Sequence, residues 1–404
     1  MIIVNECGGK LPIRIKAVKE GTLVPVSNVL MTIENTHPEC AWLTNHCETL
    51  LMKLWAPITI ATNSFYCKKT IAAALKESAK DLSSLPFKLH DFGYRGVSSE
   101  ESAGILGMSH LVNFMGTDTL NGILYANEFY NPSGVFNMYG YSVPASEHSV
   151  ACSFGKENEG EYFRNMLRSY PTGYVSIVSD TYNVYNFVET MSKENKEEIL
   201  TREGKVVFRP DSGDPILVNS KLIDILWNVF GGTYVHGYKL LPPQVGIIQG
   251  DGIDAEMIQK ILDMAKAKGF SADNWVFGSG GGLLQKFDRD TQKFAIKASY
   301  GEKEEMSLAT PESIEWSLGT VCFPIQKDPV TSAGKKSKAG VLKLHKMLHN
   351  SFMTISSVDT PKAQFESYND ELELVFEDGE IKREQTFDSV RRIAENYFNY
   401  ELRE

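Results

Sequence analysis

The chain has 404 residues, of which 42% are hydrophobic and 23% charged, and its formal net charge is -10. This composition excludes a disordered chain, and the acidic excess disfavours a protein that binds nucleic acid regardless of sequence. The six cysteines are scattered without a CxxC pair, which indicates neither a zinc site nor a secreted disulfide framework. No uncharged apolar run reaches the length of a membrane span. We therefore expect a soluble cytoplasmic protein with no membrane partner.

The N-terminal part of the chain alternates apolar and polar residues, as half-buried strands do. The alternation runs through LPIRIKAV and GTLVPVSNVLMTIEN, so residues 1–38 are expected to be rich in β-strand. Residues 40–80 change to helical spacing, and Pro57 is expected to separate two helices.

After residue 80 one unit recurs: a short apolar strand, a polar or glycine-rich turn, and an amphipathic helix. This order predicts parallel strands joined by right-handed crossovers. The predicted strands are HLVNF (110–114), YVSIVS (174–179), KVVFRP (205–210), VGIIQG (245–250) and NWVFGS (274–279).

Unusual residues gather in the turns that follow these strands. A barrel of parallel strands brings all such turns to one rim, whereas an open doubly wound sheet gathers them only near its switch point. Because at least five turns are affected, we predict an α/β fold with a (β/α) barrel. The turns are MGTDT (115–119), SDTYN (179–183), RPDSGD (209–214), QGDGID (249–254) and GSGGG (278–282).

After Arg289 the helical rhythm gives way to short strands and loops. A hairpin is expected to turn at Asp378-Gly379, followed by a final helix in FDSVRRIAENYF. We predict two domains, which are a catalytic barrel of residues 80–290 and a discontinuous, β-rich α+β domain of residues 1–79 plus 291–404.

The turn GSGGGLLQK favours an anion, because glycines let backbone N–H groups approach a phosphate at the start of a helix. It matches neither the P-loop nor the dinucleotide-binding pattern. A plain tight turn is an equally good interpretation.

Asp251 in IIQGDGID ends a strand just before a helix that Asp254 is suited to cap. Asp251 could therefore bind ribose hydroxyls or a magnesium ion through water. The alternative is a turn-forming Asp-Gly pair.

His148 in GYSVPASEHSV precedes a helical segment. It could transfer a proton or attack phosphorus if Asp180 or Glu147 held its second ring nitrogen. The alternative is a structural histidine.

The stretch LHDFGYRGVSSEE places Phe92 and Arg95 before a helix that Ser98 could cap, with Glu101 completing a capping box. An aromatic ring and an arginine at this point would also suit a flat heterocycle and a phosphate.

As a set, HDFGYRGVSS, FMGTDT, GYSVPASEHS, IVSDTYNVYN, RPDSGDP, GYKLLPP, IQGDGID and FGSGGGLLQK resemble the nicotinamide phosphoribosyltransferases, a type II phosphoribosyltransferase family. The resemblance runs from about Leu11 to the C-terminus. It implies a barrel with an attached β-rich domain, working as a homodimer with active sites at the subunit interface. The implied pentosyltransferase reaction converts nicotinamide and phosphoribosyl pyrophosphate into nicotinamide mononucleotide and pyrophosphate in NAD salvage. Mg²⁺ is implied as cofactor, and ATP as a co-substrate that acts through a phosphohistidine.

The resemblance also implies a binding site for the base. Phe92 matches the aromatic residue that stacks on one face of the nicotinamide ring, and Arg209 the arginine that flanks the ring. Asp118 matches the carboxylate that meets the carboxamide. An acceptor here welcomes an amide N–H and repels the carboxylate of nicotinic acid. The positions that line the ring pocket are Ser142 and Val143.

For the phosphate chemistry, the resemblance makes His148 the phosphorylated histidine and Asp180 its orienting partner. The positions that match contacts to ribose, pyrophosphate and nucleotide phosphate are Arg95, Asp211, Gly250, Asp251, Gly280, Gly281 and Arg289. No protein ligand to the metal is assigned, since the magnesium ion would arrive on the substrate phosphates.

Two alternatives stay open. One is a nicotinate phosphoribosyltransferase, against which Asp118 argues. The other follows from a family segment that precedes GGKLPIRIK and carries a Ser-Tyr-Lys motif, which this sequence does not match. A truncated or split form that binds nucleotide without turnover on its own is therefore a further expectation.

Overall fold

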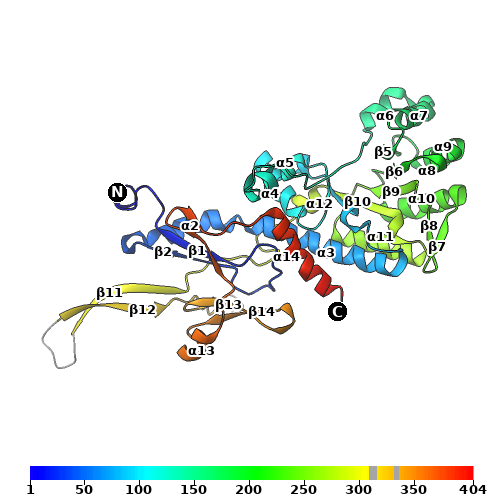
Figure 1. Cartoon of the computed structure of the whole chain (residues 1–404). Coiled ribbons are helices and arrows are strands. Elements are labelled where there is room, and N and C mark those ends of the chain that lie inside the picture. The colour runs from blue at the N-terminus through cyan, green and yellow to red at the C-terminus, as the bar shows by residue number, and fades with distance from the viewer. Residues whose placement is uncertain (309–315, 332–335, 404) are drawn as a thin grey trace. The chain divides into compact units, whose positions relative to one another are not determined.

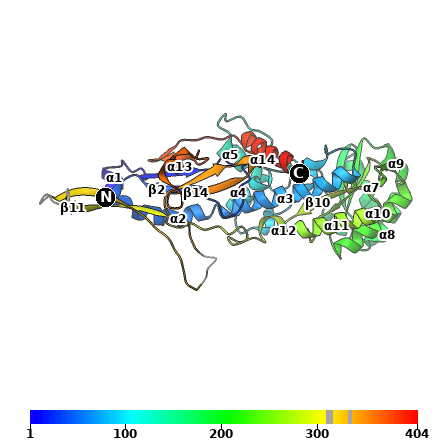
Figure 2. The ribbon, with the colours of Figure 1, turned by 90° about the horizontal axis from the view of Figure 1, so that it is seen from below.

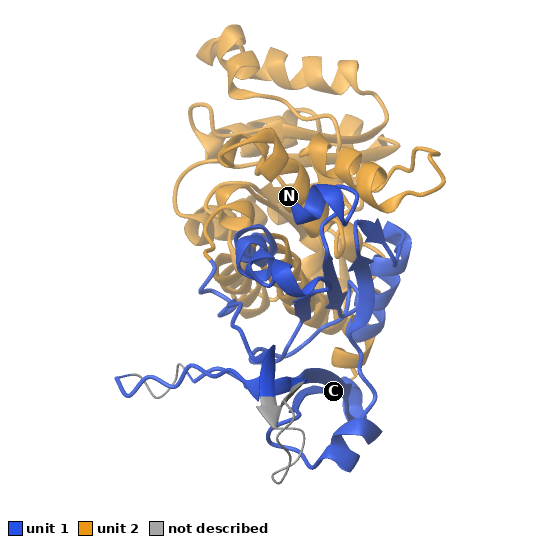
Figure 3. Cartoon of the chain, turned by 90° about the vertical axis from the view of Figure 1, so that its left-hand side faces the viewer, with its two compact units in different colours: residues 1–55, 289–397 blue, residues 56–288, 398–404 orange. Residues whose placement is uncertain are grey.

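The computed structural model describes residues 1–308, 316–331 and 336–403. The chain divides into two compact units, shown in different colours in Figure 3. The barrel unit comprises Ala56–Asp288 and Phe398–Glu404, and the β-rich unit comprises Met1–Trp55 and Arg289–Tyr397.

The first division between the units therefore falls at residue 55, not at the expected residue 79. The reason is helix α3 (Trp55–Ser78), which packs along the barrel. Ser64 on α3 hydrogen-bonds His110 Nδ1 at 2.9 Å, and the Ser78 hydroxyl accepts from Ala272 N at 2.9 Å. The second division, at 288/289, lies next to the expected one.

The barrel unit is built on a parallel sheet of six strands in the order β4-β3-β10-β9-β6-β5. Its strand interiors are apolar and buried, as the continuous Val/Ile/Phe runs predict. The α/β barrel prediction is confirmed. The strands are β3 (Leu89–Asp91), β4 (Gly116–Thr117), β5 (Gly173–Val178), β6 (Gly204–Arg209), β9 (Val245–Gln249) and β10 (Trp275–Ser279).

A short segment, residues 141–145, joins the two edges of this sheet. Tyr141 bridges Gly116 of β4, and Ala145 bridges Ser176 of β5. Backbone hydrogen bonds from Thr117 N to Tyr141 O, at 2.9 Å, and from Ser176 N to Pro144 O, at 2.8 Å, accompany the bridges. This closing segment completes the ring of strands.

Helices surround the strands on the outside of the ring (Figures 1 and 2). Their starts follow capping chemistry: Asp214 accepts from two backbone N–H groups ahead of α10, and Asp254 accepts from Met257 N ahead of α11. The helices are α3, α4 (Glu100–His110), α5 (Leu120–Tyr130), α6 (His148–Phe154), α7 (Glu159–Ser169), α8 (Val184–Glu194), α9 (Lys196–Thr201), α10 (Pro215–Phe230), α11 (Ala255–Ala267) and α12 (Gly281–Leu284). A small hairpin, β7 (Thr233–Val235) with β8 (Tyr238–Leu240), lies between α10 and β9 in the chain.

Four of the five predicted barrel strands are confirmed, and one is wrong. HLVNF covers the end of α4 and the turn after it, because His110 and Leu111 form the buried face of that helix. The true strands in this region are β3 and β4, which are too short to show an alternating pattern. The predicted cap is also displaced by one residue, since Ser99, not Ser98, accepts from Ser102 N.

The β-rich unit holds an antiparallel sheet in the order β16-β15-β1-β2 and two separate hairpins. The predicted turn at Asp378-Gly379 is confirmed, with φ values of 48° and 82° at these two residues. Within the described residues, no helix combines the length and apolar content needed to span a membrane. The strands are β1 (Ile13–Ala17), β2 (Met31–Asn35), β11 (Tyr300–Leu308), β12 (Trp316–Pro324), β13 (Leu342–Lys346), β14 (Phe352–Ser356), β15 (Glu373–Glu377) and β16 (Glu380–Ile381); the helices are α1 (Ile2–Asn5), α2 (Trp42–Met52), α13 (Lys362–Ser367) and α14 (Phe387–Glu401), whose last residues belong to the barrel unit.

Candidate active site

The carboxyl ends of β5 and β6 bring together the histidine and the carboxylates that the sequence singled out. His148, the first residue of α6, has its Nε2 atom 3.0 Å from Asp180 Oδ1. The other ring nitrogen, Nδ1, lies 4.0 Å from Asp211 Oδ2. Asp180 is almost fully buried, and its second oxygen accepts a hydrogen bond from the Ser212 hydroxyl. The imidazole is therefore oriented by one carboxylate and faced by another, and it is itself 40% exposed.

Arg209 connects this pair to the aromatic ring of Phe92. Its Nη2 atom donates to Asp211 Oδ2 at 3.0 Å, and its guanidinium carbon lies 5.8 Å from the centre of the Phe92 ring. The Nε atom is buried and has no hydrogen-bond partner within the described residues. A buried donor without a partner is costly unless a ligand supplies an acceptor.

Two glycines make room for this arrangement. A Cβ atom on Gly278 of β10 would come within 1.9 Å of Phe92 Cε2, so the ring lies directly against bare backbone. A Cβ atom on Gly250 would lie 3.3 Å from Asp211 Oδ1 and 3.4 Å from Phe92 Cε2. Sequence reasoning placed Gly250 in the site but missed Gly278, although both end a barrel strand.

Asp118 and the closing segment form the other side of the base region. The Ser142 hydroxyl donates to Asp118 Oδ1, and the Asp118 N–H donates to the carbonyl of Asp91 at 2.8 Å. The Asp118 carboxylate is exposed and Val143 is half-buried. The predicted partners Asp118, Ser142 and Val143 are therefore gathered on one arc of the rim.

No signal in the sequence indicates that Asp91 is part of the site, because an aspartate just before a glycine-containing turn is common in surface loops. Its side chain is completely buried at the end of β3, one residue before Phe92. Burial, together with the nearby charge of Asp118, raises the pKa of Asp91 to about 7, against the Gly93 N–H and Thr119, which lower it.

The predicted phosphate-binding positions lie in the turns after β9, β10 and β3. Gly280 and Gly281 begin α12, and a Cβ atom on Gly96 would lie 3.7 Å from Gly281 N, so the turn that carries Arg95 adjoins the start of that helix. Arg95 is exposed.

The remaining two members of the predicted set differ in how the structure places them. Asp251 is exposed on the same rim, and its carbonyl accepts from Gln249 Nε2 at 2.9 Å. Arg289 belongs to the β-rich unit, where it pairs with Asp290 at 3.1 Å. Among the described residues, no group of three metal-binding side chains is assembled.

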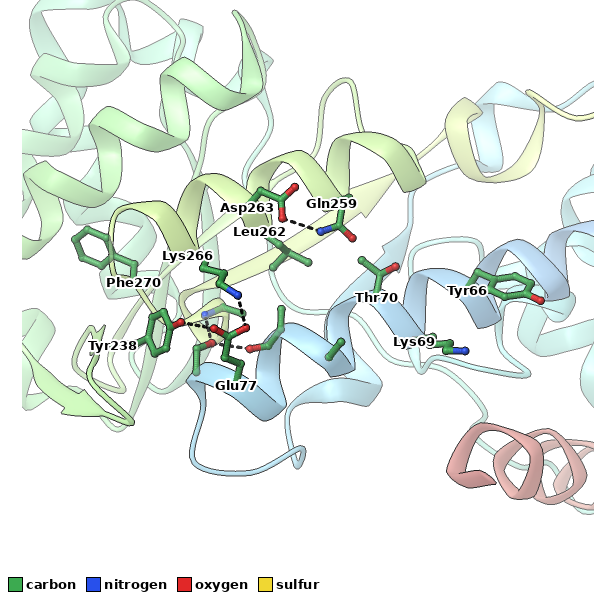
Figure 4. A pocket seen from close by; sticks show the side chains of 14 residues that line it. Tyr66, Lys69, Thr70, Glu77, Tyr238, Gln259, Leu262, Asp263, Lys266 and Phe270 are labelled. Carbon is green, nitrogen blue, oxygen red and sulfur yellow. Dashed lines mark hydrogen bonds and ion pairs between the residues drawn. The ribbon is translucent and has the colours of Figure 1, made fainter. Parts of the chain in front are cut away.

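A separate groove of about 400 Å³ lies between α3 and α11 and contains none of these residues. Its principal polar group, Glu77, accepts from the Tyr238 hydroxyl and pairs with Lys266 Nζ at 2.9 Å, as Figure 4 shows. Because this carboxylate is already satisfied by the protein, the groove does not call for an ionic ligand.

Comparison with known proteins gives concordant results. The model of the nicotinate phosphoribosyltransferase (NAPRTase) family matches residues 87–378. A nicotinamide phosphoribosyltransferase from Xanthomonas campestris pv. campestris is 42% identical over 97% of this chain and 81% of its own length. One from Acinetobacter baylyi is 37% identical over 96% of this chain and 77% of its own, and one from Mycoplasma pneumoniae is 31% identical over 82% and 71%.

A solved structure shares the fold. It is the nicotinate-nucleotide pyrophosphorylase from Pyrococcus furiosus, with a TM-score of 0.56 at 15% identity, covering 96% of this chain and 80% of the other. The family match over residues 87–378 and the relatives at 42% and 37% identity establish that the chain belongs to the nicotinate phosphoribosyltransferase (NAPRTase) family.

Proposed function

We propose that the protein is a nicotinamide phosphoribosyltransferase of NAD salvage, converting nicotinamide and phosphoribosyl pyrophosphate into nicotinamide mononucleotide and pyrophosphate. The observation that carries the proposal is the barrel rim, where the Phe92 ring and the Arg209 guanidinium face each other. The turn with an acceptor carboxylate, Asp118, is bonded to the residue just before Phe92. A flat, uncharged ring with an amide group fits these three side chains. The names of the relatives support the same reaction.

In this proposal Asp118 selects the base. Its carboxylate accepts from the carboxamide N–H of nicotinamide, and the Ser142 hydroxyl holds the carboxylate in place. Nicotinate would bring a second negative charge to the same position, and the repulsion between the two carboxylates costs binding energy.

Bond breaking at the ribose carbon leaves a centre with oxocarbenium character. Asp211, which is held by Arg209 at 3.0 Å, and Asp251 are the carboxylates on the rim that would stabilise this positive charge and bind the ribose hydroxyls. The backbone N–H groups at Gly280 and Gly281 would bind phosphate oxygens, together with Arg95.

ATP coupling is proposed to use His148. Asp180 accepts from Nε2–H, which leaves the Nδ1 lone pair free to attack the γ-phosphorus of ATP. The new N–P bond forms as the bond to the leaving ADP oxygen breaks, and the positive charge on the ring is shared with Asp180. Because Nδ1 lies 4.0 Å from Asp211, the phosphoryl group would enter the region where the pyrophosphate of the substrate lies.

A magnesium ion would enter this site bound to the phosphates of the substrate. No three ligating side chains converge among the described residues, so the chain offers individual carboxylates, not a cage. Mg²⁺ commonly combines one or two carboxylates with substrate phosphates. When bound, it would neutralise the charge that develops on the departing pyrophosphate.

The decisive experiment measures mononucleotide formation by the purified chain from phosphoribosyl pyrophosphate, Mg²⁺ and ATP, with nicotinamide or nicotinate offered separately. Product from nicotinamide, with an Asp118→Asn variant that loses much of the preference over nicotinate, is expected. Product from nicotinate alone would establish the alternative activity, and no product from either base would favour a form that only binds nucleotide.

A second assay tests the phosphohistidine. With γ-³²P-labelled ATP, the wild type is expected to carry acid-labile, alkali-stable label, and His148→Ala to carry none. Asp180→Asn should lower ATP stimulation while leaving base selectivity unchanged. Equal labelling of the His148→Ala variant would reject this part of the proposal.

We further propose a cytoplasmic homodimer with active sites at the subunit interface. Leu120 and Leu124, one helical turn apart on α5, are 62% and 52% exposed, an apolar pair that would be covered by a second copy. All six cysteines are free, in keeping with a reducing compartment. Light scattering of the wild type and of Leu124→Arg tests this; a monomeric wild type would contradict it.

A further inference from the structure

We propose that Asp91 is a positioning residue for base binding: its buried carboxyl holds the turn after Phe92, its backbone carbonyl holds Asp118, and its protonation changes the affinity for nicotinamide. The inference rests on the proposed function, and it adds a pH-dependent control to base recognition. The Phe92 ring carries no titratable group and cannot itself supply such control.

The geometry places Asp91 between these two residues. Its Oδ1 atom accepts from Gly93 N at 2.7 Å, which fixes the turn immediately after Phe92. Its carbonyl accepts from Asp118 N at 2.8 Å, which fixes the start of the turn after β4. A single residue is thus bonded to both of the turns that hold the base-binding side chains.

The packing around the carboxyl leaves it no freedom to move. A Cβ atom on Gly107 of α4 would lie 3.3 Å from Asp91 Oδ2, so the helix backbone lies close to this oxygen. Asp91 Oδ2 has no hydrogen-bond partner of good geometry within the described residues, and neither has the Thr119 hydroxyl, although Thr119 is near enough to lower the pKa of the carboxyl. Any change in the charge of Asp91 must therefore be accommodated by the surrounding turns.

The charged neighbour of this carboxyl is Asp118, whose negative charge raises the pKa of Asp91 further. The other surfaces around it are uncharged: Gly93 and Leu284 on one side, and Gly107 and Thr119 on the other. Also on β3, His90 has its ring 6.2 Å from that of Phe92 and feels the charge of Asp118, but burial lowers its pKa, so that it is neutral near pH 7.

The sign of the effect follows from linkage. The pKa of Asp91 is about 7, so that near neutral pH the carboxyl is present in both protonation states. Protonated Asp91 carries no charge and leaves the Asp118 turn undisturbed, so the protonated protein binds nicotinamide more tightly. As the pH rises through 7, Asp91 ionises, is repelled by Asp118, and the affinity for the base falls.

The test compares nicotinamide KM at saturating phosphoribosyl pyrophosphate between pH 6 and 8, a range in which nicotinamide itself stays uncharged. In the wild type, KM is expected to rise about threefold to tenfold, where a tenfold change corresponds to one unit of pKa shift on binding. Asp91→Asn keeps an acceptor for Gly93 N but cannot ionise, so its KM should stay low and flat. Asp91→Ala lacks the acceptor and should show a KM raised about tenfold at every pH, with the KM for phosphoribosyl pyrophosphate unchanged.

Two further measurements test whether the Asp91 carboxyl itself titrates and whether the effect is specific to it. Infrared difference spectra should show a protonated carboxyl that titrates near pH 7 in the wild type and is missing in Asp91→Asn. Asp263→Asn, the same chemical change at an exposed position on α11, should leave the wild-type pH profile intact.

The outcomes are distinct. A pH-dependent KM that persists in Asp91→Asn, or an Asp91→Ala variant with wild-type KM, would overturn the inference while leaving the proposed function standing. An inactive wild type at every pH would overturn the proposed function, and with it the role assigned to Asp91 here.

Discussion

The two ends of the barrel use charged residues in opposite ways. At the amino ends of the strands, Lys88 is buried and contacts Asp273 Oδ1 at 2.8 Å, Asp273 O at 2.8 Å and Trp275 O at 3.0 Å. At the carboxyl ends, Arg209 keeps a buried nitrogen without a partner among the described residues, and Asp91 keeps a carboxyl that burial leaves protonated up to about pH 7. At the amino end, the buried polar atoms have partners within the protein, which stabilises the fold. At the carboxyl end, some polar atoms lack a protein partner and are available to a ligand.

The largest effect that would sharpen this contrast is expected at the amino end. Lys88→Met should lower the free energy of unfolding by about 3 kcal/mol, because the Asp273 carboxylate and the backbone carbonyls of Asp273 and Trp275 lose their donor. Turnover per folded molecule at low temperature should stay within about twofold of the wild type, since this end is remote from the rim. Urea unfolding and steady-state kinetics measure the two quantities. A large loss of kcat with unchanged stability would break the comparison.

At the carboxyl end, Gly278→Ala is expected to lower activity more than stability. The added Cβ atom must displace the Phe92 ring, since it would lie only 1.9 Å from Cε2. We expect kcat/KM for nicotinamide to fall about 100-fold, the usual result of an ångström-scale misplacement in a site. Gly319→Ala, where a Cβ atom meets nothing within 4 Å, is the matched control and should be neutral. Normal kinetics in Gly278→Ala would contradict the stacking role of Phe92.

A smaller effect concerns stability and pH at Asp91. Its pKa is about 7 in the folded chain and about 3.9 in the unfolded chain, so between these values the folded state binds the proton that the unfolded state releases. Stability contributed by this group is therefore full below about pH 4 and is lost as the pH rises to about 7. Asp91→Asn should gain on the wild type by about 2 kcal/mol between pH 5 and 7, as measured by urea unfolding at each pH. Parallel stability curves would show that the carboxyl is already ionised.

The smallest effect is expected at Asp254, the N-terminal cap of α11, which takes part in neither the buried ion pair nor the base-binding residues. Asp254→Ala removes the acceptor for Met257 N, at 3.0 Å, and should lower the free energy of unfolding by about 1 kcal/mol. Asp254→Asn, which keeps an accepting oxygen, should recover most of the loss. Thermal unfolding of the two variants is sufficient, and an equal loss in both would mean that the ion pair with Lys286 is what matters.

Much of the rim could be predicted from the sequence, because its residues follow apolar strands whose ends are visible as turns. Arg209 and Asp211 are brought together with His148 and Asp180 as expected. The rest depends on contacts between distant segments. Gly278 matters through Phe92, and no local pattern predicts that contact.

The fold was less predictable where strands are very short and where a helix belongs to a different unit from the one predicted. Strands β3 and β4 have three and two residues, too few for an alternating pattern to appear. Helix α3 has helical spacing in the sequence, but only tertiary packing through Ser64 and Ser78 assigns it to the barrel unit. The two-domain division itself stays a prediction.

The closing segment has a mechanical consequence. Residues 141–145 complete the ring with two isolated bridges, whereas neighbouring strands such as β5 and β6 are paired along six residues. The wall of the cylinder is therefore held by few pairings along this segment, and Ser142, which holds the Asp118 carboxylate, lies in it. If this segment parted from its neighbours, the cylinder would widen beside the base without unzipping any pair of full strands. The segment that lets nicotinamide enter and leave would then be the same segment that carries Ser142 and so helps to recognise the base.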